Sequence, residues 1–236
     1  VCLRSDGQGV CQEVAPALPQ PRARIINISF GGDGECNSPN APYQPAIDAA
    51  RARGVVIVAA AGNENARPTR PAKCAGVIGV AALNRNGLKA TYSNFGSMLA
   101  VATVGGDNHE PGDDRWAQVA DSGLRTVSND GSTAPGPSGY ANYFGTSFST
   151  PVVAGAISLM LSQNPALTAA QIEQGLRVSA RPHVTSPVPG VGLCGDANPG
   201  RCLCTATTCG AGILDVDEAL RYAEALRQGN PYTPLN

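Results

Sequence analysis

A serine lies just before a long apolar segment, where a helix is expected to begin. Ser147 stands within Phe144–Pro151 (FGTSFSTP), and largely apolar residues follow. The free backbone N–H groups and the macrodipole of a helix N-terminus favour developing negative charge. Ser147 is therefore a candidate nucleophile whose own N–H helps to hold an oxyanion. The alternative is that a serine or threonine of this segment only caps the helix, with Pro151 at its first position.

An asparagine follows a predicted buried strand. Val55–Ala59 is a short apolar run, and Ala60, Ala61, Gly62 and Asn63 come directly after it. In α/β sheets, ligands bind beyond the carboxyl ends of the strands. The side-chain NH2 of Asn63 could donate to an oxyanion there, and the small residues would leave an open slot beside it. The alternative is an ordinary turn-forming asparagine.

These segments need a scaffold, and the apolar pattern predicts one. Arg24–Phe30, Val55–Ala59 and Val77–Ala81 are predicted buried strands, and Gln44–Arg53 is a predicted helix that ends at Gly54. Strand, helix and strand at this spacing form a βαβ unit, so we predict an α/β fold with a mostly parallel sheet between helices. The end of the first strand could offer backbone groups to an extended peptide.

The second half of the chain is predicted to be loop and helix. Residues 105–143 lack periodicity and are interpreted as a long loop that could hide short strands. Pro151–Gln163 is apolar nearly all round and is predicted to be a buried central helix. Thr168 and Gln171 predict a capping box that opens a helix to about Ala180. A short strand at 210–214 and a helix at 215–227, capped by its first residue, complete the prediction.

Composition excludes several classes of protein. The chain has 236 residues, a net charge of −1, 42% hydrophobic residues and 15% charged residues. This balance excludes a globally disordered chain and argues against a nucleic-acid or membrane-surface binder, which needs a basic face. No apolar run reaches the roughly 18 to 20 residues of a membrane span.

Eight cysteines indicate disulfides and an oxidising compartment, secreted or periplasmic. A zinc site built from the last four cysteines is the alternative, although Cys202-Leu203-Cys204 is shorter than the usual zinc-binding C-x2-C pair. Spacing alone does not give the pairing. We expect a local Cys2–Cys11 loop, a Cys36–Cys74 bridge and two bridges among the C-terminal cysteines.

Four segments in this order resemble the subtilisin-like serine proteases. Gly145–Gly155 (GTSFSTPVVAG) resembles the family's nucleophile segment, Val56–Asn63 its V-x-x-A-A-G-N stretch, Ser29–Gly31 its S-L-G or S-F-G strand end, and Tyr92–Gly96 its Y/F-S-N-x-G motif. The resemblance covers about residues 24 to 180. It implies the family's three-layer fold, with residues 1–236 forming the C-terminal portion of one catalytic domain.

The resemblance implies roles for individual residues. Ser147 would be the nucleophile, and the Asn63 amide with the Ser147 N–H would form the oxyanion hole. Ser29, Phe30 and Gly31 would pair with the substrate backbone. Ala60, Ala61 and Gly62 would form a wall of the S1 pocket. The implied partner is a peptide or protein substrate.

One departure from the family pattern concerns the catalytic base. In the family, the Asp and the His precede the substrate strand. This chain has only His109 and His183, both after Asn63, and we interpret them as surface or loop residues. The expectation is that an N-terminal fragment of the same protease, with the first strands of the sheet, carries the Asp and the His.

Two other functions remain open. A catalytically inactive peptide-binding fragment or pseudo-protease would keep the cleft without the base. An α/β-hydrolase esterase would need a G-x-S-x-G elbow, and Gly145–Ser149 lacks its final glycine.

An acidic turn raises the question of a metal. Asp107, Glu110, Asp113 and Asp114 cluster as calcium ligands could, but their spacing matches no EF-hand loop. A solvated acidic turn is the alternative. No cofactor is expected for the chemistry, and structural calcium is left as a possibility.

Overall fold

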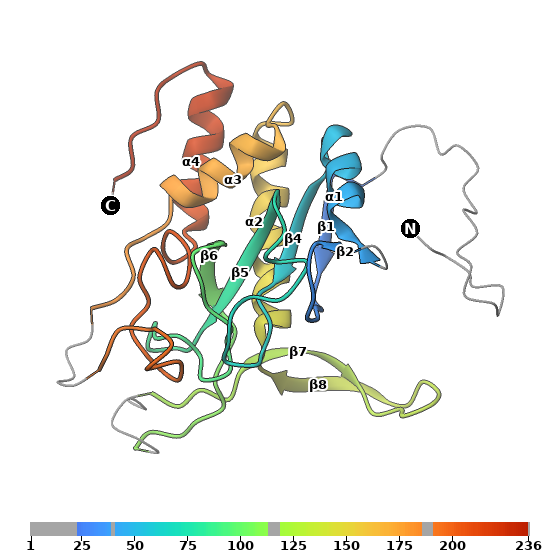
Figure 1. The fold of residues 1–236 in the computed structure, drawn as a ribbon, viewed down its shortest axis with the longest axis vertical. Coiled ribbons are helices and arrows are strands. Elements are labelled where there is room, and N and C mark those ends of the chain that lie inside the picture. Colours follow the sequence, from blue (N-terminus) through green and yellow to red (C-terminus); the bar gives the residue numbers. More distant parts are fainter. Residues whose placement is uncertain (1–22, 39–40, 113–118, 186–190, 236) are drawn as a thin grey trace.

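A parallel sheet forms the centre of the molecule (Figure 1). The computed structural model describes residues 23–38, 41–112, 119–185 and 191–235. The four strands are ordered β1-β4-β5-β6 and all neighbours run parallel. Their bounds are Ile25–Ile28, Val56–Ala60, Val77–Leu83 and Leu99–Val104. Every residue of β4 and β5 is buried, as expected for β-branched runs covered on both faces.

Helices cover both faces of the sheet, so the fold has three layers. Helix α1 (Tyr43–Ala52) packs on one face, where Ile47 meets Ile57 and Ala59 of β4. Helices α2 (Thr146–Gln163), α3 (Ala169–Val178) and α4 (Val216–Arg227) pack on the other. The predicted three-layer α/β architecture is confirmed.

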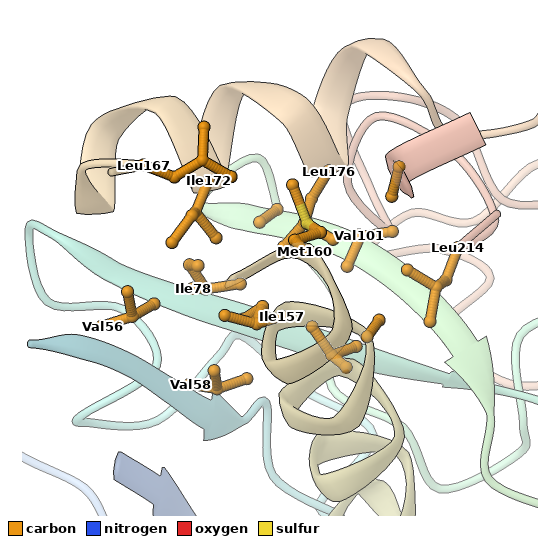
Figure 2. Close-up of a cluster of buried hydrophobic side chains, with 14 of the residues drawn as sticks. Val56, Val58, Ile78, Val101, Ile157, Met160, Leu167, Ile172, Leu176 and Leu214 are labelled. Atoms are coloured by element: carbon orange, nitrogen blue, oxygen red, sulfur yellow. The ribbon is translucent and has the colours of Figure 1, made fainter. Parts of the chain in front are cut away.

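The larger core lies between the sheet and the three later helices (Figure 2). Val56 and Val58 point from β4 towards Ile157 and Met160 of α2, and all four side chains are fully buried. Because side chains alternate along a strand, the intervening Ile57 faces α1 instead. Burial of such side chains stabilises the fold by about 1.5–3 kcal/mol each.

Two antiparallel ribbons lie outside the main sheet. β2 (Asn37–Ser38) pairs with β3 (Ala41–Pro42), and β7 (Leu124–Asn129) pairs with β8 (Ser138–Tyr143). Figure 1 shows β7 and β8 extending away from the sheet and the helices. This hairpin occupies most of the second half of the predicted 105–143 loop. Its β7 strand alternates between half-buried and exposed residues, a pattern that a search for fully apolar runs does not detect.

Several predicted boundaries need correction. Helix α2 begins at Thr146, five residues before the predicted start, so Pro151 lies inside the helix and not at its first position. β6 was not predicted. The predicted strand at 210–214 is reduced to single bridges from Ile213 to Ala102 and to Arg181.

The predicted helix caps are confirmed. Thr168 Oγ1 accepts a hydrogen bond from Gln171 N at 3.2 Å, and Thr168 N donates to Gln171 Oε1 at 2.9 Å. Asp215 Oδ1 likewise accepts from Glu218 N at 3.1 Å and caps α4. The Thr168 hydroxyl and the Asp215 carboxylate thus accept from backbone N–H groups that a helix leaves unpaired at its N-terminus.

Three disulfides join described residues. Cys36 bonds to Cys74 as predicted, and the C-terminal cysteines pair as Cys194–Cys202 and Cys204–Cys209. The two C-terminal bridges are confirmed, and oxidised sulfurs leave no thiolates for the alternative zinc site. The predicted Cys2–Cys11 bridge lies outside the described residues.

The helices were also compared with the length and apolar character of a membrane span. Among the described residues, none of them meets both requirements.

The capping box of α3 gives a stability prediction. Thr168→Ala removes the acceptor for Gln171 N, so the free energy of unfolding of the chain falls by about 1 kcal/mol. Urea unfolding followed by circular dichroism measures the change. Thr233→Ala, an exposed site after α4, is the matched control and changes it by less than about 0.5 kcal/mol. Equal effects of the two substitutions would contradict the assignment of the cap.

Candidate active site

Ser147 lies in the first turn of α2, at the end of β1. Its Oγ donates to the backbone carbonyl of Ser29 at 2.9 Å, and Ser29 Oγ donates to the carbonyl of Ser147 at 2.9 Å. Both serines are half-buried. This reciprocal pair of hydrogen bonds fixes the predicted nucleophile against the predicted substrate-binding strand.

Pro151 explains why the carbonyl of Ser147 is available. In an α-helix that carbonyl would accept from the N–H of residue 151, but proline has no N–H. Ser29 Oγ takes the place of the missing donor. The proline inside α2 therefore couples the helix to β1.

Asn63 reaches the same helix turn from the end of β4. Its Oδ1 accepts from Thr146 N and from Thr146 Oγ1, both at 2.9 Å. These two bonds orient the side-chain amide of Asn63, so that Oδ1 faces Thr146 and Nδ2 stays available to another acceptor. The structure thus places Asn63 against Thr146, the residue that precedes Ser147.

Two N–H donors converge beside Gly145. A methyl group built on Gly145 Cα would lie 3.7 Å from Asn63 Nδ2 and 3.8 Å from Ser147 N. Gly145 itself has φ 146°, a conformation that residues with a side chain rarely adopt. Because Ser147 N lies in the first turn of α2, it has no intrahelical partner. The position of such a methyl group is therefore bordered by two nitrogen donors and, at 3.7 Å, by Phe148 Cδ2.

The predicted substrate strand is accessible. Phe30 is 67% exposed, and Gly31 and Gly32 follow β1 at the surface. A side chain on Gly31 would meet Thr69 Oγ1 at 2.5 Å, so the close approach of this neighbouring segment requires glycine. Gly32 and Arg70 exchange two backbone hydrogen bonds, which hold the strand end in place.

Of the three small residues in the predicted pocket wall, only Gly62 reaches the surface. Ala60, the last residue of β4, is 3% exposed, and Ala61, which follows it, is fully buried. Gly62 is half-buried, with φ 109°. A ligand at this wall would thus meet Gly62 and not the alanine side chains.

Sequence reasoning missed the side chains that hold Asn63. Thr146 was part of the nucleophile segment, yet its contact with Asn63 depends on the fold. Asn94 was part of the Tyr92–Gly96 motif, and its Oδ1 accepts from Glu64 N and Ala66 N on either side of residue 65. The motif was the available signal, but it did not indicate which segment the amide would contact.

Neither histidine contacts Ser147 Oγ. His183 is half-buried, and one ring nitrogen, Nε2, lies 2.9 Å from the carbonyl of Gly210. Burial lowers the pKa of His183, and the bond to Gly210 partly opposes this effect. His109 lies in a loop, as the prediction of a surface or loop residue allows, but it is buried, with 5% of its surface exposed. Backbone pairing of His109 with Asp121 draws the ring inward.

The acidic turn is more structured than a solvated loop. Asp107 is 6% exposed, and its carboxylate accepts from Arg201 Nε at 2.7 Å and from Thr91 N at 2.8 Å. A carboxylate engaged in this way does not offer free oxygens to a cation. Asp113 and Asp114 lie outside the described residues, so calcium at this turn stays an untested prediction.

Comparisons with known proteins identify relatives of the chain. A model of the subtilase family, peptidase S8, matches residues 4–208. An extracellular protease of Xanthomonas campestris pv. campestris is 38% identical over 211 residues, which are 88% of this chain and 30% of that protein. Subtilisin BL of Lederbergia lenta is 31% identical over 195 residues, which are 81% of this chain and 62% of that protein.

A solved protease structure from Pseudoalteromonas arctica has the same fold. Its TM-score is 0.69 at 34% identity, over 89% of this chain and 54% of that one. The chain thus spans 30% to 62% of the length of these three proteins. The family match, the relatives and the shared three-layer fold establish that this chain belongs to the subtilase family of peptidases.

Proposed function

We propose that the chain is the nucleophile-bearing portion of a secreted serine endopeptidase, which hydrolyses peptide bonds through an acyl-enzyme on Ser147. The observation that carries this proposal is the convergence of Asn63 Nδ2 and Ser147 N on the space beside Gly145. A peptide carbonyl attacked by Ser147 Oγ develops negative charge on its oxygen. Two fixed N–H donors stabilise that charge more than they stabilise the uncharged carbonyl.

The substrate would bind as an extended strand. Ser29 lies directly beside Ser147, because the two are hydrogen-bonded in both directions, and Phe30 and Gly31 follow Ser29 in the chain. Peptide backbone paired along this edge would bring a scissile carbonyl to Ser147 Oγ. Gly62, with Ala60 and Ala61 behind it, would border the side chain that precedes the scissile bond.

The proton of Ser147 needs an acceptor from outside the described residues. It is donated to the carbonyl of Ser29, which cannot serve as a general base at neutral pH. In the proposed reaction, a histidine takes this proton as Oγ bonds to the carbonyl carbon. The same histidine then gives the proton to the leaving amine. In the second half of the reaction, water attacks the acyl ester, the histidine takes a proton from that water, and it returns a proton to Ser147 Oγ as the acid is released.

An N-terminal portion of the same protease is the proposed source of that histidine and its orienting aspartate. Among the described strands, β1 lies at the edge of the sheet, and Ile26 on it is 37% exposed. A groove of about 480 Å³ lies beside it, lined by Arg24, Ile25 and residues of α2 including Leu161. An unpaired edge next to an apolar helix offers main-chain and side-chain partners for further strands.

Secretion is part of the proposal. The Xanthomonas campestris relative is named an extracellular protease, and three disulfides join described residues here. Disulfides persist in oxidising compartments and are rare in the cytosol. Calcium at the Asp107 turn is not needed for any proposed step.

The proposed function can be tested by assembling the catalytic centre. The chain alone hydrolyses a peptide substrate negligibly, and co-expression with the polypeptide that precedes it in the full-length protein restores hydrolysis. A fluorophosphonate probe then labels Ser147, because phosphonylation of the serine needs a general base. Mass spectrometry of the labelled peptide locates the adduct.

Two serines of the first turn of α2 make a matched pair for this test. Ser147→Ala abolishes labelling and hydrolysis, whereas Ser149→Ala, at a buried neighbour, retains both. An isolated chain with full activity that Ser147→Ala abolishes would disprove the need for an N-terminal portion. An assembled protein that binds peptide but is never labelled would instead establish the inactive binding fragment.

A further prediction concerns the oxyanion hole. Removing one oxyanion donor from subtilisin, a relative of this chain, lowers kcat by about 10²–10³-fold, and we expect the same scale for Asn63→Ala in the assembled enzyme. KM changes little, because the donor acts mainly in the transition state. Steady-state kinetics measure both constants. Asn230→Ala, at an exposed site near the C-terminus, is the control. A loss confined to KM would contradict the assigned role.

A further inference from the structure

The loop that carries Asn63 is fastened to the segment 89–96. Asn65 N donates to the carbonyl of Tyr92 at 2.8 Å, and Asn94 N donates to the carbonyl of Gly62 at 3.0 Å. The Asn94 side chain adds a donor to Ala61 O at 3.1 Å and accepts from Glu64 N and Ala66 N. The segment 89–96 therefore binds the loop both before and after Asn63.

Lys89 begins this segment and is fully buried. Its Nζ donates to Asn65 Oδ1 at 3.0 Å, to the carbonyl of Ala90 at 2.9 Å and to that of Ser93 at 2.8 Å. The carbonyl of Thr91 lies further away, at 3.4 Å. The amino group thus joins the loop of Asn63 to the segment beneath it.

The surroundings of Nζ make Lys89 an unusual lysine. It forms no ion pair with any carboxylate in the described part of the chain, and its nearest aromatic ring is that of Phe95, 5.6 Å from Nζ to the centroid. Burial lowers the pKa of Lys89 to about 7, and the Asp107 carboxylate opposes this effect. A buried amino group is costly unless its N–H groups are bonded, and here three close oxygens accept them.

We propose that Lys89 is a positioning residue for the oxyanion donor: its Nζ holds Asn65, and through Asn65 it fixes the loop that aims Asn63 at the space beside Gly145. This inference rests on the proposed function and extends it to a residue outside the catalytic centre. Asn65 is the residue of the Asn63 loop to which Lys89 Nζ donates. It has φ 57°, a left-handed conformation that few residues other than glycine adopt, and the bond from Lys89 holds its side chain there.

The kinetic test compares two lysine substitutions in the assembled enzyme. Lys89→Met keeps the length and apolar stem of the side chain but removes the N–H donors. We expect kcat to fall about 10-fold or more with KM nearly unchanged, because displacement of Asn63 weakens binding of the transition state and spares the ground state. Lys73→Met, at a half-buried lysine paired with the exposed Glu35, is the matched control and keeps both constants. A wild-type kcat in Lys89→Met would overturn the proposal.

A second variant covers the case in which Lys89→Met does not fold. Asn65→Gly removes only the acceptor of Lys89 in the loop and tolerates the left-handed backbone. It should lower kcat with KM retained, and its effect should not add to that of Lys89→Met when both are present. Asn65→Gly with an unchanged kcat, or two effects that add fully, would overturn the role through Asn65.

A readout without catalysis separates this inference from the proposed function. In hydrogen exchange of the chain, the amides of Glu64, Asn65 and Ala66 should exchange faster in Lys89→Met than in Lys73→Met, while the buried β4 amides stay protected. Equal exchange of the three loop amides in both variants would refute positioning by Lys89. If the assembled wild type hydrolyses nothing, the proposed function fails, and this exchange comparison still decides the role of Lys89.

Discussion

The site depends on the reciprocal hydrogen bonds between Ser29 and Ser147. They join the end of an edge strand to the first turn of the central helix, two segments 118 residues apart in the chain. Pro151 makes this contact between Ser29 and Ser147 possible. Any other residue at this position would offer an N–H to the carbonyl of Ser147 and would compete with Ser29 for it. A proline that would usually weaken a helix here frees one carbonyl for a tertiary contact.

The same helix turn also holds Asn63 through Thr146. Thr146 is fully buried, and both its N–H and its hydroxyl donate to Asn63 Oδ1. Since buried polar groups need partners, these bonds satisfy Thr146 while they orient the asparagine amide. Three consecutive residues, 145 to 147, thus provide the glycine beside the two N–H groups, the contact that orients Asn63 and the proposed nucleophile. The donors are fixed before any substrate arrives, which is what electrostatic stabilisation of a transition state requires.

Much of this arrangement could be predicted from sequence, because its signals are local. The apolar runs of β4 and β5, the caps at Thr168 and Asp215, and the order of the motifs around Asn63 and Ser147 are all contained in short segments. The features that were missed depend on distant partners. The early start of α2 needs Ser29 to compensate for Pro151, and the burial of His109 needs the strand-like pairing with Asp121. The sequence carries no signal for the burial of Lys89, because lysines are usually exposed, and only the fold brings three oxygens to its amino group.

The geometry around Ser147 also restricts how a base can reach it. A neutral hydrogen bond contributes about 1 kcal/mol net, so the bond from Ser147 Oγ to Ser29 is weak enough for an imidazole nitrogen to replace it. The direction of approach is limited, however. Asn63 and Gly145 border one side of the serine, and β4 to β6 extend the sheet away from β1 on another. Among the described strands, β1 lies at the free edge of the sheet, and under the proposed function strands paired along it would bring a base to Ser147 without moving Asn63. Under the proposed function, the chain would need a proton acceptor and no rearrangement of Asn63, Gly145 or Ser147.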